Sequence, residues 1–302
     1  MKVFVAGASG AIGRPLIAEL INQGHVVTAM SQSEEGAKRL LDQGAAVERV
    51  NAFDAPAVEL ALRRSQAEAV IDELTSLPKD PADIANYLPG DKRLRLEGGG
   101  NLHKAAQACS VRRYLQQSSG FFLRPGPGLA DESESMAVDA SPGISTSARM
   151  YAELEERTLR PGEMEGIALR YGFIYGPNTW YHRDSVIADT VRQGQFPIVG
   201  EGLGVWSFVH VEDVARATVA ALTAPPGVYN LVDDDPLPVV QWLPRFAMWV
   251  DAPPPQRVSE DAARNTAGED AVYYGTKLRG ASNRKAKEAL KFRPRRLEWL
   301  ND

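Results

Sequence analysis

Three glycines near the start of the chain are the residues whose type and spacing point most directly to chemistry. Gly7, Gly10 and Gly13 follow an apolar run at residues 3–6 and precede a helical pattern. In a strand–turn–helix setting, such glycines allow a tight turn, close backbone approach to a pyrophosphate and close packing of the helix on the sheet. The free N–H groups at the helix start suit a phosphate. A glycine-rich turn without a ligand is the alternative. We predict a dinucleotide phosphate site formed by Gly7, Ser9, Gly10, Ala11, Ile12 and Gly13.

The residues that follow a second predicted strand, at 25–30, bear on the choice of dinucleotide. They are Ser31, Gln32 and Ser33, and no acidic side chain comes before Glu34. An acid here would bind the adenosine ribose hydroxyls and favour NAD, whereas hydroxyl and N–H groups can bind a 2′-phosphate. The cations that could reach such a phosphate are Arg14, Lys38 and Arg39. Arg14 as a surface helix residue is the alternative. We therefore predict NADP as the cofactor, with NAD as the second choice.

The first half of the chain alternates between strand and helix patterns, which predicts the scaffold that holds the glycine turn. Further strand patterns fall at residues 46–50, 69–74, 113–117 and 165–171, and helix patterns at 34–43, 56–64, 94–109 and 146–159. Such alternation indicates a parallel sheet with right-handed crossovers. We predict an α/β fold, with a Rossmann-type doubly wound parallel sheet over residues 1–175.

Beyond residue 175 the predicted elements become shorter and less regular, which indicates a smaller mixed α/β substrate lobe over residues 176–302. We expect this lobe to pack on the carboxyl edge of the sheet, where the ligands of such sheets bind. Residues 78–90, 121–145 and 253–270 are rich in turn-forming or polar residues, and we predict loops there. The second of these is long and Gly/Pro-rich, as is typical of a lid or binding loop.

Composition limits the class of protein. With 302 residues, 44% hydrophobic and 24% charged, the chain can bury a sizeable core. A net charge of −5 argues against non-specific nucleic-acid binding. The single cysteine, Cys109, excludes an internal disulfide, and the four histidines lack metal-ligand spacing. No apolar run is long enough for a bilayer span. We expect a cytoplasmic protein that acts on a small molecule, without a metal, membrane or nucleic-acid partner.

Several separated motifs resemble those of the extended short-chain dehydrogenase/reductase superfamily, the NAD(P)-dependent epimerase/dehydratase group. They are GASGAIG at 7–13, AFDAPAV at 52–58, the segment 98–120, LRYGFIYGP at 169–177, FVHVEDVARATVAAL at 208–222 and VYNLVDDDP at 228–236. The resemblance implies that Asp54 meets the adenine. It also implies cofactor contacts at Leu74 and Thr75 after the fourth strand, and at Tyr171 and Phe173 at the nicotinamide end. A homodimer is usual in the family.

The family's chemistry uses a serine and a Tyr-x3-Lys pair, and this chain lacks the lysine. One register makes Tyr151 the catalytic tyrosine and puts Glu155 in the lysine position. A second register moves Tyr151 to the lysine position. A glutamate four residues from a tyrosine would raise the tyrosine pKa. The nearby cations on this helix are Arg149 and Arg157, and the spacing of Arg157 turns it away from Tyr151. Ser119 is the preferred catalytic serine, with Ser118 as the alternative.

These features predict an atypical NAD(P)-dependent oxidoreductase or epimerase-like enzyme for a small carbonyl, alcohol or sugar-type substrate. Tyr151 is its acid/base group. Aromatic residues gather in sequence around the predicted substrate lobe: Trp180, Tyr181, Trp206 and Phe208. They would suit a sugar ring or a flat apolar substrate, or would pack as core. The alternatives are a non-catalytic NAD(P)-binding sensor or regulator, supported by the missing lysine, and an isomerase or dehydratase that retains its cofactor.

Overall fold

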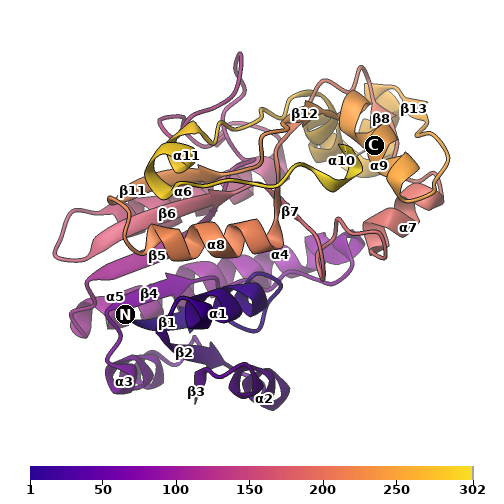
Figure 1. Ribbon diagram of the computed structural model, residues 1–302. Coiled ribbons are helices and arrows are strands. Elements are labelled where there is room, and N and C mark those ends of the chain that lie inside the picture. The colour runs from indigo at the N-terminus through magenta and orange to yellow at the C-terminus, as the bar shows by residue number, and fades with distance from the viewer. Residues whose placement is uncertain (301–302) are drawn as a thin grey trace.

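A central sheet of seven parallel strands organises the fold (Figure 1). The computed structural model describes residues 1–300. The strand order is β11–β6–β5–β4–β1–β2–β3, with every neighbouring pair parallel. The strands are β1 (Lys2–Ala6), β2 (Val26–Ser31), β3 (Ala46–Arg49), β4 (Ala69–Asp72), β5 (Arg113–Ser119), β6 (Glu165–Tyr171) and β11 (Gly227–Leu231). This arrangement confirms the predicted Rossmann-type α/β class.

Helices cover both faces of the sheet. One face carries α1 (Gly13–Asn22), α2 (Glu34–Asp42), α8 (Val211–Ala221) and α11 (Arg284–Leu290), and the other carries α3 (Ala55–Ser65), α5 (Gly99–Ala108) and α6 (Pro142–Leu159). The apolar stripe of α1, which includes Leu16 and Leu20, is fully buried in the first core. Helices α1 and α8 pack side by side, so an element from late in the chain completes the cover of the first strand (Figure 1).

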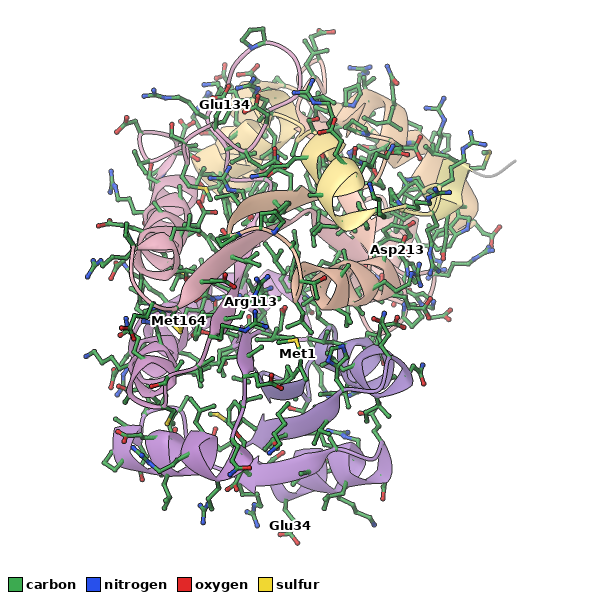
Figure 2. The ribbon with its side chains drawn as sticks, turned by 60° about the vertical axis from the view of Figure 1, so that its left-hand side comes forward. Met1, Glu34, Arg113, Glu134, Met164 and Asp213 are labelled. Carbon is green, nitrogen blue, oxygen red and sulfur yellow. The ribbon has the colours of Figure 1, made fainter. Side chains whose placement is uncertain are left out.

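The amino edge of the sheet is tied together separately from the opposite edge. Figure 2 shows Met1, Arg113 and Met164 near one another, each at or just before the start of a strand, and Glu134 far from them. Arg113 donates to the Ala221 carbonyl at 3.3 Å and also bonds Glu165. The amino edge is therefore closed by backbone and ion-pair contacts, which leaves the carboxyl edge for ligands.

The remaining elements form a second core, rich in aromatic side chains. They are β7 (Phe173–Tyr175), β8 (Ile198–Val199), β9 (Val205–Trp206), β10 (Phe208–His210), β12 (Leu237–Pro238), β13 (Arg257–Val258), α7 (Val186–Arg192), α9 (Val239–Trp249), α10 (Glu260–Thr276) and η3 (Glu298–Leu300). Trp242, Phe208 and Phe246 at its centre are fully buried. Most of these elements follow the predicted lobe boundary at 176, but β7 precedes it, and α8, β11 and α11 return to the sheet. Residues 301–302 of that lobe lie outside the described residues.

Two predicted loops are wrong. Residues 78–90 contain η1 (Pro81–Asp83) and most of α4 (Ile84–Arg93), which continues through the π-helical segment η2 (Leu94–Gly98) into α5. Proline at the first turn costs a helix little, and tertiary contacts outweigh the cost of Pro89 inside α4. Residues 260–276 form α10, which is capped by Ser259 and interrupted at Gly268. Its polar composition is that of a surface helix. The segment at 120–141 remains without a helix.

The turn at Gly7 gives a first prediction. Gly7 and Gly24 both have a left-handed φ, of +75° and +78°. A Cβ at Gly7 would overlap the Glu73 carbonyl, whereas a Cβ at Gly24 meets nothing within 4 Å. Gly24→Ala should therefore cost only the left-handed backbone strain, about 1 kcal/mol, and Gly7→Ala about 3 kcal/mol or more. Denaturant unfolding of both variants measures the difference. Equal losses would contradict the packing of this turn against the end of β4.

Candidate active site at the carboxyl edge

The glycine turn has the geometry of an anion site. It leaves β1 at Gly7 and closes with a hydrogen bond from the Gly10 N–H to the Gly7 carbonyl at 3.0 Å. A Cβ on Gly13 would overlap Ala8, so this glycine permits α1 to begin close to the turn. The residue that precedes α1, Ile12, provides no side-chain cap to the helix. The first N–H groups of the helix are therefore available to a phosphate.

The end of β2 lies next to a small cavity between α1 and α2. Ser33 caps α2 by accepting the Gly36 N–H at 3.0 Å, and the Ser31 hydroxyl donates to the Ser33 carbonyl at 3.1 Å. Gln32 is exposed between them. The cavity has a volume of about 250 Å³ and is lined by Ser9, Arg14, Gly36, Arg39, Leu40, Asp42 and Gln43. Two of the three predicted phosphate-binding cations thus share one cavity, and Lys38 lies outside its lining.

Three other predicted cofactor residues occupy different environments. Asp54 is exposed and caps α3 by accepting the Ala57 N–H at 3.1 Å. Leu74 is buried, and its N–H donates to the Asp72 carboxylate at 3.1 Å. Thr75 donates its hydroxyl to Asp91 at 2.9 Å. The backbone of Leu74 lies against Gly7, so the end of β4 adjoins the glycine turn.

Arg95, on η2, is one of the buried ionisable residues at this edge that sequence reasoning missed, together with Asp91 and Glu73. Its guanidinium is buried and donates to Asp91 at 2.7 Å, to Gln117 at 2.9 Å and to Thr75 at 2.8 Å. Burial opposes the charge, but the neighbouring Tyr151 and Asp91 raise the pKa of Arg95 above its ordinary value. It therefore stays cationic. The spacing of Asp91 and Arg95, one helical turn apart, was its only sequence signal.

Tyr151, the predicted acid/base group, lies beside this cation. Its ring centroid is 5.4 Å from the Arg95 guanidinium carbon, and its ring also packs on Phe122. Tyr151 is buried, and its hydroxyl makes no hydrogen bond within residues 1–300. Burial raises the pKa of Tyr151, and Arg95 opposes that rise. The phenol is therefore protonated at neutral pH.

The expected influence of Glu155 on Tyr151 is wrong. The Glu155 carboxylate faces Arg170 on β6, with N···O distances of 2.7 and 2.8 Å, and also accepts the Ser118 hydroxyl at 2.6 Å. Its charge is neutralised there. Arg149 does not reach Tyr151 either, because its guanidinium donates to the Val138 carbonyl.

Arg157 faces away from Tyr151, as its spacing predicts. It donates to the Leu96 carbonyl at 3.1 Å and to Gln116 at 3.0 Å, on the side of η2 and β5. The cation beside Tyr151 therefore comes from a different helix than the one that carries the tyrosine.

The two candidate serines at the end of β5 differ in their bonding. The Ser118 hydroxyl is committed to Glu155, as described above. The Ser119 oxygen only accepts a long hydrogen bond of 3.4 Å from the Phe121 N–H, so its proton remains available. Both serine side chains are buried.

Glu73, directly after β4, is a buried acid close to the glycine turn. One of its carboxyl oxygens accepts the Tyr171 hydroxyl at 2.6 Å, and that hydroxyl also lies 2.8 Å from Thr218. The other oxygen is buried without a hydrogen-bond partner in residues 1–300. Burial raises the pKa of Glu73 to about 8. Tyr171, a predicted cofactor residue, thus holds a neutral acid instead of facing outward.

Phe173, the last predicted cofactor residue, stands in a stack of three rings that we name the aromatic stack: Phe121, Phe173 and Trp206. Each neighbouring pair has its centroids 4.1 Å apart and nearly parallel planes. Tyr181 packs edge-on to Phe173 and Trp206, and Phe208 packs against both with a tilted ring. Trp180 donates its indole N–H to the Pro78 carbonyl at 3.1 Å and links the two lobes. Of the predicted aromatic cluster, Trp206 and Phe208 are therefore core.

Two features are absent from residues 1–300. No group of three or more His, Cys, Asp or Glu side chains is arranged to hold a metal ion within this range. None of the helices in the same residues is both long enough and apolar enough to cross a bilayer.

Comparison with known proteins places these features in context. A model of the NAD dependent epimerase/dehydratase family matches residues 3–231. A 3-diazoavenalumate denitrifying reductase from Streptomyces sp is 37% identical over 302 residues, which cover 99% of this chain and 98% of the relative.

Solved structures with bound NAD share the fold. The UDP-glucose 4-epimerase of Thermus thermophilus, in complex with NAD, has a TM-score of 0.72 at 22% identity, covering 99% of this chain and 96% of the other. The dTDP-glucose 4,6-dehydratase DesIV from Streptomyces venezuelae, with NAD and TYD bound, has a TM-score of 0.76 at 16% identity, covering 99% and 93%.

The raised pKa of Glu73 gives a prediction for stability. The folded protein keeps this proton up to about pH 8, whereas the unfolded chain loses it near its ordinary pKa of 4.5. Between these values the folded state binds more protons, so the free energy of unfolding falls as pH rises, by up to about 1.4 kcal/mol per pH unit from this group. Glu73→Gln should remove that component. Denaturant unfolding at several pH values, with exposed Glu153→Gln as the control, measures it. Parallel curves for wild type and Glu73→Gln would contradict the buried neutral acid.

Proposed function

Since the chain belongs to the NAD dependent epimerase/dehydratase family, we propose that it is an NAD(P)-dependent reductase that delivers hydride to a small aromatic molecule. The observation that carries this proposal is the state of Tyr151, whose unbonded hydroxyl is kept protonated by burial next to aromatic side chains. A protonated phenol donates a hydrogen bond or proton to a reduced substrate. It is a poor base for taking a proton from an alcohol, which is how oxidation and sugar epimerisation begin.

The residues of the carboxyl edge suit such a cofactor. The turn at Gly7, Gly10 and Gly13 offers backbone N–H groups to the pyrophosphate, and the end of β4 adjoins that turn. When bound, the dinucleotide supplies the hydride. The chain's own part is to orient the substrate, with the unused Ser119 proton and the Tyr151 hydroxyl as the two donors to it. We assign Ser118 a structural role because it is bonded to Glu155.

The proposed acceptor is a flat arene. The aromatic stack begins at Phe121, two residues after Ser119, and Phe122 packs on Tyr151. Arenes that carry a diazo group are the first substrates to test, because the 37%-identical relative is a denitrifying reductase of a diazo compound. In that reaction a hydride forms the new C–H bond while the C–N bond breaks, and its electrons leave with N₂. No proton from the protein is consumed in this step, so Tyr151 would serve it only as a hydrogen-bond donor to the bound arene.

Aromatic carbonyl compounds are the second substrates to test, because the free hydroxyls of Ser119 and Tyr151 could both bind a carbonyl oxygen. In this case hydride adds to the carbonyl carbon, and the oxygen takes a proton from Tyr151. A cytoplasmic location, as expected from the sequence, and a homodimer, as is usual in the family, are further parts of the proposal.

Consumption of NADPH and NADH over a panel of aromatic diazo compounds, aldehydes, ketones and nucleotide sugars tests the proposal. We expect turnover with at least one aromatic acceptor. Tyr151→Phe should lower carbonyl reduction about 100-fold, because a general acid is lost, and should change diazo reduction less than tenfold. Tight cofactor binding without any turnover would overturn the proposal in favour of a sensor. Conversion of a nucleotide sugar without net cofactor use would favour an epimerase.

The cavity beside β2 gives a separate prediction for the cofactor. We propose that Arg14 and Arg39 bind the 2′-phosphate of NADP, supported by their shared cavity with Ser9. The double change Arg14→Gln/Arg39→Gln should weaken NADPH binding at least tenfold, because charged hydrogen bonds contribute about 1.5–3 kcal/mol, and should leave NADH binding nearly unchanged. Lys38→Gln, on the same helix but outside the cavity, is the matched control. Fluorescence titration of each protein with NADPH and with NADH measures these affinities. Tighter binding of NADH than of NADPH by the unaltered protein would reverse the assignment to NAD.

A further inference from the structure

We propose that Arg95 is a positioning residue that takes the place of the missing lysine, and that it contacts Tyr151 from η2 and not from α6, the helix that carries the tyrosine. It places a fixed positive charge against the tyrosine ring and orients the phenol with its hydroxyl free. The proposal rests on the role given to Tyr151 in the proposed function.

Hydrogen bonds from all three of its nitrogens fix the orientation of the Arg95 guanidinium. Its partners come from three elements: Asp91 one turn earlier on α4, Gln117 on β5, and Thr75 after β4. All three nitrogens are used, so the plane of the group is set, and its carbon lies 5.4 Å from the Tyr151 ring centroid. This separation is within the range of a cation–π interaction. The ring is thereby packed on one side by Arg95 and contacted by Phe122, which leaves its hydroxyl as the group without a protein partner in residues 1–300.

The local helix geometry is what brings Arg95 to this position. Residues Leu94–Gly98 form a π-helical turn, a wide turn that is often found at functional sites. The glycines that follow allow the helix to lie against the sheet. A Cβ on Gly98 would be 2.9 Å from the Ala52 Cβ, and one on Gly99 would be 2.8 Å from an Asp72 oxygen. Gly98 and Gly99 therefore allow the close approach of this helix.

The charges around Tyr151 leave Arg95 as the decisive cation. Burial raises the pKa of Tyr151; Arg95 lowers it, and Asp91 and Glu73 raise it. Glu73 carries a proton at neutral pH, so it adds little negative charge. In residues 1–300, no other cation bears on the titration of Tyr151. No lysine occurs between Lys104 and Lys277, so α6 has none to offer.

The test is the titration of Tyr151 in the free protein, which needs no substrate. The tyrosinate absorbance of each protein is compared with that of its Tyr151→Phe counterpart, which isolates this tyrosine. Asp91→Asn leaves Arg95 unopposed and should lower the pKa of Tyr151 by about one unit, the size expected for a charge at this range. Asp91→Asn/Arg95→Gln removes both charges without leaving a buried carboxylate unpaired, and should raise the Tyr151 pKa above that of Asp91→Asn. Arg93→Gln, the exposed arginine two residues away, is the matched control.

Equal Tyr151 titration in Asp91→Asn and in the double variant would overturn the proposal. If the double variant does not fold, Arg95→Lys, which keeps the charge, is compared with the wild type instead: a similar Tyr151 pKa supports the proposal, and a pKa raised by about one unit or more overturns it. An unchanged or raised Tyr151 pKa in the Asp91→Asn variant would also overturn the proposal.

Where a carbonyl substrate turns over, the double variant should lower kcat about tenfold with little change in KM. It should cause no further loss in a Tyr151→Phe background. Absence of turnover would count against the proposed function and would leave the titration result standing.

Discussion

The buried ion pair between Asp91 and Arg95 is the interaction on which the geometry of the carboxyl edge depends. Removing two charges from water is costly, and a buried pair is favourable only when further hydrogen bonds complete it. Here Gln117 and Thr75 bond the arginine, and Thr75 and the Ser76 N–H bond the aspartate. The pair thus joins α4 to the ends of β4 and β5. Loss of either member would leave a lone buried charge at the carboxyl edge of the sheet.

A second buried ion pair, between Glu155 and Arg170, lies at the same edge and determines which side chains remain free for chemistry. It uses the hydroxyl of Ser118 and the acid that follows Tyr151 on α6, so neither is left for chemistry. What remains free are the Ser119 proton and the Tyr151 hydroxyl. The site is therefore one of donors, with its bases either neutralised or, as at Glu73, protonated. An electrophile that accepts hydride is the substrate chemistry most compatible with this set.

The fold was predictable from the sequence, while the site was predictable only in part. The glycine turn and the order of the strands follow from local patterns, because turn glycines and apolar periodicity act over a few residues. Arg95 could not be found this way. Its role depends on a π-helical turn and on Thr75 and Gln117, which are distant in sequence. The prolines around Pro89 suggested a loop because their local cost is visible, whereas the compensating contacts of Asp91 are not. The polar residues of α10 were interpreted as a loop for a related reason: a surface helix needs few apolar side chains, so its sequence resembles that of a loop.

The return of α8 and β11 to the sheet has a consequence for how the chain acquires its structure. β11 pairs with β6 along five residues, and α8 covers α1 at the other end of the sequence. Residues 1–175 by themselves would leave β6 as an unprotected edge and the first helix uncovered. A chain that ends before residue 231 would therefore expose the edge of β6, and an exposed strand edge favours aggregation. We infer that the boundary near residue 176 separates two surfaces that face the ligands. The two lobes nevertheless fold together as one cooperative unit.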